Sequence, residues 1–144
     1  MELARQHLAK FGRDGDIIVP EASTATVEEA AAALGVIPAR IAKTLAVYDQ
    51  TGEGAFIIVV AGDAKLDNQK FKARFGFKPH MLKGEDTERL TGHAFGGVCP
   101  FGVPEGTPVY LDVSLKRFVT VFPACGTGNS AIELTLPELE EYSL

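Results

Sequence analysis

Two apolar runs near the middle of the chain give the clearest secondary-structure signal. Residues 55–61 are continuously apolar and rich in β-branched side chains, which is typical of a buried strand. Residues 41–48 form a second apolar run, interrupted by Lys43 and Thr44. The segment between them, residues 50–54, is polar and contains glycine. We therefore expect the two runs to pair as a hairpin.

Helical spacing or helix-capping signals mark three further segments. Residues 2–11 place apolar side chains among polar ones at roughly helical intervals. Thr26 and Glu29 have the form of a capping box and open an alanine-rich helix that should stop near Gly35. Residues 67–75 place two phenylalanines on one face and basic side chains around the other. We predict a helix in each of these segments.

Shorter segments complete the expected architecture. Strands are predicted at residues 16–20, 79–82, 108–113, 118–122 and 131–136, and helical turns from residue 38, at 86–90 and at 137–142. Strands paired by short turns, with helices interspersed unevenly, favour the α+β class. We predict one compact domain over residues 1–144, with a mixed, mostly antiparallel sheet flanked by helices.

Composition narrows the class of protein. The chain has 144 residues, 46% of them hydrophobic and 23% charged, as in an ordinary globular domain. A net charge of −5 argues against a classical basic nucleic-acid binder, and no DNA partner is expected. No run of 18 apolar residues predicts a membrane span, and the first residues lack the layout of a signal peptide. These features predict a cytoplasmic location and no membrane partner.

Basic residues are concentrated in one segment. Between residues 65 and 83 the only acid is Asp67, and the basic residues are Lys65, Lys70, Lys72, Arg74, Lys78 and Lys83. A local basic stripe on an acidic body can guide a polyanion to one face. The alternative is a solvated helix face without a partner.

A glycine-rich loop is the first candidate for chemistry. Gly96, Gly97 and Gly102 allow tight turns and a close approach of backbone to ligand, and Pro100 stiffens the same loop. Such a loop can present bare amide N–H groups to an anion or oxyanion. It matches neither the dinucleotide fingerprint nor the phosphate-loop signature, so an ordinary tight loop is the alternative.

Lys43 and a second permissive loop are further candidates. Lys43 lies within an apolar run, which suggests a partly buried and electrostatically responsive ammonium, although a strand-end lysine usually points to water. Residues 126–130, Gly-Thr-Gly-Asn-Ser, either line a pocket or simply form a turn.

The two cysteines suggest neither a disulfide framework nor a metal site. Cys99 and Cys125 match no common metal-ligand spacing. His93 is near Cys99 in sequence, but sequence proximity is no sign of a catalytic pair, and no third partner can be assigned.

The order of several short motifs resembles the YbaK family, which includes the editing domain inserted in bacterial prolyl-tRNA synthetases. The resemblance runs from about Ser23 to the C-terminus, leaving residues 1–22 as an N-terminal helix and strand. It is carried by Ala42-Lys43-Thr44-Leu45, Ala61-Gly62-Asp63 with Leu66-Asp67 and Lys70, Thr91-Gly92, Gly96-Gly97-Val98-Cys99-Pro100, Tyr110-Leu111-Asp112, and Gly126 before Ile132-Glu133-Leu134.

This resemblance implies a barrel-like mixed sheet and a free-standing enzyme that hydrolyses the ester of a mischarged tRNA, with no metal or organic cofactor. Lys43 is the position most closely tied to activity in the family, and the loop Gly96, Gly97, Val98, Cys99 and Pro100 presents backbone amides to the substrate. Additional pocket candidates are Thr24, Asp112, Gly126 and Thr127. Lys65, Lys70, Lys72 and Arg74 are candidate contacts for the acceptor end of the tRNA.

One departure from the family leaves the amino acid open. Several relatives carry a serine where this chain has Ala124, so the role of that hydroxyl is either absent or moved to Thr127 or Ser130. The two leading substrates are tRNA(Pro) carrying alanine and tRNA(Pro) carrying cysteine. Two other readings are a binding module without turnover and a partner that acts only when docked on a synthetase, such as prolyl-tRNA synthetase.

Overall fold

The computed structural model describes residues 2–22, 26–93, 97–127 and 129–143 of the chain. The α-helices within these ranges are α1 (Glu2–Ala9), α2 (Val27–Leu34), α3 (Asn68–Phe75), α4 (Gly84–Thr91) and α5 (Leu136–Tyr142). Three short 3-10 helices, η1 (Asp14–Asp16), η2 (Pro38–Arg40) and η3 (Val113–Arg117), connect them to the strands. Among the described residues, no helix has the length and apolar character needed to cross a bilayer.

One mixed sheet organises the domain. Its strands are β1 (Ile41–Tyr48), β2 (Ala55–Ala61), β3 (Val109–Leu111), β4 (Thr120–Pro123) and β5 (Leu134–Thr135). They follow the order β3-β2-β1-β4-β5. The β1–β2 and β4–β5 pairs are antiparallel, whereas β1–β4 and β2–β3 are parallel. The predicted α+β class and single-domain architecture are confirmed.

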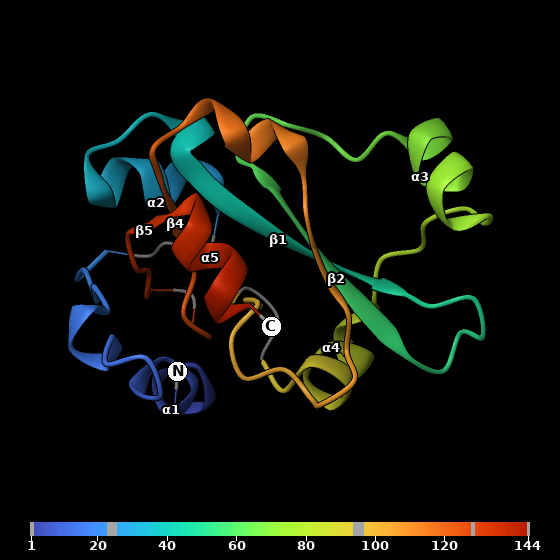
Figure 1. Ribbon diagram of the computed structural model, residues 1–144, viewed down its shortest axis with the longest axis horizontal. Helices are drawn as coiled ribbons and strands as arrows, with labels where there is room; N and C mark the ends of the chain where they lie inside the picture. The colour runs from blue at the N-terminus through green and yellow to red at the C-terminus, as the bar shows by residue number, and fades with distance from the viewer. Residues whose placement is uncertain (1, 23–25, 94–96, 128, 144) are drawn as a thin grey trace.

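The long β1–β2 hairpin forms the centre of the sheet (Figure 1). The predicted pairing is confirmed, with Lys43 opposite Val60 and Val47 opposite Phe56. Because successive side chains of a strand point to opposite faces, the hairpin supplies two separate cores. Ala42 and Ala46 face the larger core with Ile57, Val59 and Ala61. Val47 faces the smaller one with Phe56, Ile58, Val60 and Phe71.

Helix α3 covers the smaller core and stands apart from the other helices (Figure 1). The Asp67 carboxylate accepts a hydrogen bond from the N–H of Lys70 and caps the helix at its start. Gly76 ends it in the left-handed conformation, with a φ of 86°. Phe71 and Phe75 turn inward, so the basic side chains of this helix stay on the surface.

Several short strands predicted from sequence are reduced to single bridges. Residues 16–20 form no strand, because Ile18 alone pairs with Ala131 and the chain then reaches Pro20, which has no N–H to continue a ladder. Residues 79–82 contribute only a bridge from Met81 to Val47. The expected strand at 131–136 shortens to β5, because Ala131 makes only isolated bridges, with Ile18 and Ala124, and α5 already begins at Leu136. Backbone partners, rather than local propensity, set these lengths.

Candidate functional site

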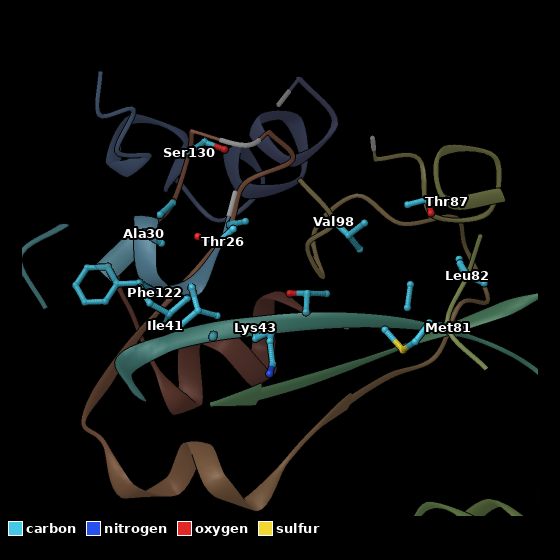
Figure 2. Close-up of a pocket in the computed structure, with 16 residues that line it drawn as sticks. Thr26, Ala30, Ile41, Lys43, Met81, Leu82, Thr87, Val98, Phe122 and Ser130 are labelled. Carbon is cyan, nitrogen blue, oxygen red and sulfur yellow. The ribbon is translucent and has the colours of Figure 1, made fainter. Parts of the chain in front are cut away.

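A cavity of about 190 Å³ opens on the β1 side of the larger core. Its walls come from β1, α2, α4, the end of β4 and the two glycine-rich loops, which contribute Val98 and Ser130 (Figure 2). Most of the lining is apolar, including Ala42, Ala46 and Val98. The polar lining side chains with hydroxyl groups are Thr26, Thr44, Thr87 and Ser130. A small apolar cavity with a few hydroxyls is suited to a small ligand held by hydrogen bonds.

Strand β1 offers an unpaired edge at the floor of this cavity. Its pairing with β4 covers only Ile41 and Ala42. Farther along, the N–H of Leu82 donates to Ala46 O at 3.1 Å, and the N–H of Tyr48 donates to His80 O at 2.9 Å. The even-numbered residues of β1 therefore point their peptide groups away from β2. Thr44 lies between these two pairings, and within the described ranges no strand pairs with it on that side.

The hydroxyl of Thr44 is also without a partner. Its Oγ1 is buried, and it is the one buried side-chain nitrogen or oxygen of the described residues that makes no hydrogen bond. Leaving a buried hydroxyl unpaired costs roughly 1–3 kcal/mol. Thr44 therefore presents an N–H, a C=O and a hydroxyl that a bound ligand could satisfy. Sequence reasoning missed this residue, because a threonine within a strand looks ordinary until its neighbours on the edge are known.

The ammonium of Lys43 lies on the other side of β1. Lys43 is among the residues that line the cavity, but its side chain points away from Val98, Thr26 and Ser130 (Figure 2). The Nζ donates to the carbonyl oxygen of Ala64 at 2.8 Å. The expected partial burial of Lys43 is confirmed. Its charge also contributes to lowering the pKa of Asp63, whose main partner is the guanidinium of Arg117.

The two glycine-rich loops meet in space. A Cβ placed on Gly97 would lie 2.6 Å from both C and O of Gly126 and 2.7 Å from the Cα of Thr127. Real Cβ atoms essentially never approach so closely, so only glycine fits at residue 97. Gly126 itself has a φ of 93°. The structure thus brings Gly97 and Gly126 together, although 28 residues of sequence lie between them.

A hydrogen-bonded chain fixes the first of these loops to α4. The hydroxyl of Thr91 donates to Thr87 O at 2.6 Å and accepts from the N–H of His93 at 3.1 Å. His93 Nε2 lies 2.6 Å from the carbonyl oxygen of Phe101. Burial lowers the pKa of His93, so the ring is neutral near pH 7 and can donate through Nε2. His93 therefore anchors the loop just beyond Val98, Cys99 and Pro100.

Cys99 is placed as a structural residue. Its side chain is fully buried, and its Sγ lies 3.5 Å from His93 Nε2 and 3.6 Å from Phe101 O. Burial raises the pKa of Cys99 to about 12, and burial also raises the pKa of Cys125. A thiol that stays protonated is a poor nucleophile. Among the described residues, no three His, Cys, Asp or Glu side chains gather as a possible metal site.

The second loop supplies a buried hydroxyl to the cavity. Ser130 is fully buried and lines the cavity beside Ala124 and Ala131. Its Oγ accepts from the Thr127 hydroxyl at 2.8 Å and from the Thr127 N–H at 3.3 Å. Ser130 therefore supplies a hydroxyl to the same cavity that Ala124 lines.

Other predicted site residues lie elsewhere. Asp112 caps η3 by accepting from the N–H of Ser114 at 3.0 Å, and it lies beside the edge strand β3 rather than at this cavity. Lys65, Lys70 and Arg74 border a different cavity beneath α3, and Lys72 is exposed on that helix. Thr24 and Gly96 lie outside the described residues.

Comparisons with known proteins identify the family to which this chain belongs. The aminoacyl-tRNA editing domain model matches residues 21–142. The uncharacterized protein YwhH of Bacillus subtilis (strain 168) is 52% identical over 143 residues, which are 99% of this chain and 90% of YwhH.

Solved structures show the same fold. One, reported as a candidate trans-editing enzyme for prolyl-tRNA synthetase, has a TM-score of 0.88 and 31% identity, covering 99% of this chain and 90% of that one. The hypothetical protein APE2540 has a TM-score of 0.80 and 29% identity, with 93% and 92% covered. Together with the match over residues 21–142, these similarities show that this chain belongs to the aminoacyl-tRNA editing domain family.

Proposed function

We propose that this protein is a trans-acting aminoacyl-tRNA deacylase, which hydrolyses the ester between a wrong amino acid and the 3′ end of a tRNA. Membership of the editing domain family supports a deacylase role, and the similar candidate trans-editing enzyme supports a link to prolyl-tRNA synthetase. The observation that carries the proposal is the small cavity at the unpaired β1 edge, beside the joined Gly97 and Gly126 loops.

The size of the cavity favours a small aminoacyl group. Its volume of about 190 Å³ is below that of pockets for drug-sized ligands, which start near ~300 Å³. Apolar side chains of Val27, Ala30 and Val98 would surround an aliphatic or thiol side chain. We therefore propose tRNA(Pro) carrying alanine or cysteine as the substrate. Such a pocket separates substrates that differ by one methylene by only about 1–3 kcal/mol, so both remain candidates.

Backbone groups would carry the chemistry. Attack on the ester carbonyl carbon gives a tetrahedral intermediate, whose oxyanion needs fixed donors. We assign that task to amides of Gly97, Val98 and Cys99, in the loop that also includes Gly96 and Pro100. A water molecule or a ribose hydroxyl of the substrate is the proposed attacking group. When water attacks, the intermediate collapses, the bond to the ribose oxygen breaks, and that oxygen takes up the proton that water gave up as the free amino acid leaves. When a ribose hydroxyl attacks, the aminoacyl group moves to that oxygen, and water then hydrolyses the new ester in the same way.

Thr44 would position the substrate. Its buried hydroxyl makes no hydrogen bond, and within the described ranges no strand pairs with Thr44 on the open side of β1. The amino group and carbonyl of an aminoacyl ester supply a matching donor and acceptor. Thr127 and Gly126 would act by holding the loop that contacts Gly97.

Lys43 would act from the opposite side of β1. Its hydrogen bond to Ala64 ties the strand to the segment that follows β2. We propose that this ammonium either holds β1 in place or turns toward the terminal adenosine phosphate when RNA binds. Lys43→Arg keeps the charge but changes the geometry of the hydrogen bond. Comparing this variant with Lys43→Ala separates the contribution of charge from that of position.

The test is to incubate purified protein with tRNA(Pro) carrying alanine, cysteine or proline and to measure the free amino acid released. We expect release from alanyl- or cysteinyl-tRNA(Pro), little release from prolyl-tRNA(Pro), and a large loss of activity in Lys43→Ala. Lys10→Ala, on the exposed end of the α1 region, is the matched control. If the protein binds tRNA but releases no amino acid, both alone and with prolyl-tRNA synthetase added, it is a binding module and not a deacylase.

A further inference from the structure

A second cavity, of about 390 Å³, lies between α3 and the edge strand β3. Ile58 and Val60 of β2 form part of its floor. These two side chains belong to the smaller core, whereas the first cavity adjoins Ala42 and Ala46 of the larger one. The two cavities therefore lie on opposite faces of the sheet.

The second cavity is bordered by positive charge. Lys65, Lys70 and Arg74 line it, and none of the three forms a salt bridge with a described residue. Two carboxylates, Asp67 and Asp112, also line it. Both already accept hydrogen bonds as helix caps, from the N–H groups of Lys70 and Ser114. Three cations and two carboxylates give the lining a net charge of +1, which favours an anion beside the lysines.

Aromatic rings form another part of the wall. Phe71, Phe75 and Tyr110 line the cavity, with the rings of Phe75 and Tyr110 5.1 Å apart in an edge-to-face arrangement. The guanidinium of Arg74 lies 4.9 Å from the ring centre of Phe75 and 5.5 Å from that of Tyr110. A planar cation held against aromatic rings is a surface on which another flat group can stack.

We propose that this cavity binds a nucleotide, with the base against Arg74 and Tyr110 and the phosphate at Lys65 and Lys70. Cations interleaved with aromatic rings are the usual means of binding single-stranded nucleic acid without sequence preference. An acidic peptide would engage the cations but leave the ring surface without a flat partner. The proposal rests on the proposed function only in naming RNA as the source of the nucleotide.

Two neighbouring lysines provide a matched pair of variants to test nucleotide binding. Lys70 and Lys72 are both exposed on α3, but only Lys70 lines the cavity. Titration calorimetry with AMP and CMP would measure binding to wild type, Lys70→Glu, Arg74→Ala and Lys72→Glu. We expect Lys70→Glu and Arg74→Ala to weaken binding by roughly tenfold or more, as for loss of a charge-assisted contact, and Lys72→Glu by about twofold or less.

Several outcomes would overturn the proposal. If Lys70→Glu and Lys72→Glu weaken nucleotide binding equally, the nucleotide is attracted by the general positive charge of α3 and not bound in this cavity. Inorganic phosphate binding as tightly as AMP would indicate an ion site without base stacking, and a hexaglutamate peptide displacing AMP would indicate a peptide site. Because mononucleotide binding requires no turnover, it is independent of deacylation. If RNA is the source, Lys70→Glu raises the KM for full-length aminoacyl-tRNA and leaves kcat unchanged.

Discussion

Gly97 and Gly126 lie in direct backbone contact, closer than any side chain would allow: a Cβ on Gly97 would be 2.6 Å from the carbonyl of Gly126. This contact joins the two glycine-rich loops at the wall of the candidate cavity. It explains why residue 97 must be glycine, since the backbone atoms that a Cβ would meet cannot yield as a flexible side chain would. Residue 126 favours glycine for a separate reason, because its φ is 93°.

Gly97→Ala should therefore disrupt the site. We expect a loss of unfolding free energy of roughly 1–3 kcal/mol from overpacking, together with a fall in deacylation rate that exceeds what the lost stability explains. Chemical denaturation and deacylation assays measure the two effects. Gly84→Ala is the matched control, because nothing lies within 4 Å of a Cβ at residue 84. Normal activity in Gly97→Ala would show that the loop contact does not shape the site.

Thr44→Val should separate stability from function. Removing an unpaired buried hydroxyl at nearly constant shape is expected to raise the unfolding free energy by about 1 kcal/mol while weakening substrate binding. Thr91→Val is the opposite case, because that hydroxyl hydrogen-bonds Thr87 and His93, and its loss should destabilise the fold by roughly 1–3 kcal/mol. Thermal or urea unfolding distinguishes the two variants. Equal destabilisation by both would mean that Thr44 is already satisfied in the free protein.

The buried ring of His93 should make stability depend on pH. Burial lowers its pKa from the ordinary 6.5, so the unfolded chain binds the proton more tightly than the folded one. Stability is then intact above about pH 6.5 and falls as pH decreases toward the lowered value. His93→Gln keeps a donor for Phe101 O but cannot titrate, so its stability should vary less over this range. Urea unfolding at several pH values, with His80→Gln as an exposed control, measures this difference.

Cys99 should be dispensable as a nucleophile. Because burial raises the pKa of Cys99 to about 12 and the side chain is fully enclosed, iodoacetamide should leave it unmodified in the native protein and modify it after unfolding. Cys99→Ala should keep deacylation within about threefold, since the backbone amide is retained and the volume change is small. Rapid native alkylation that abolishes activity would restore the thiol as a catalytic candidate.

Local patterns in the sequence determined most of the secondary structure. The continuous apolar run at 55–61 and its neighbour at 41–48 could hardly be anything but paired buried strands, and the Thr26–Glu29 and Pro137 signals correctly marked helix starts. These features depend on residues close in sequence, where propensity and capping act. The order of short motifs also indicated the family that the comparisons show.

Only the tertiary structure decided how these pieces meet. The side of β1 on which each residue lies follows from the register with β2 and β4, so the sequence could suggest Lys43 but could not show that its ammonium faces away from the cavity or that Thr44 is left unpaired. The contact of Gly97 with Gly126 and the separation of Asp112 from that site are likewise long-range facts. They depend on which strands pair and on where each pairing stops, which local residue preferences do not encode.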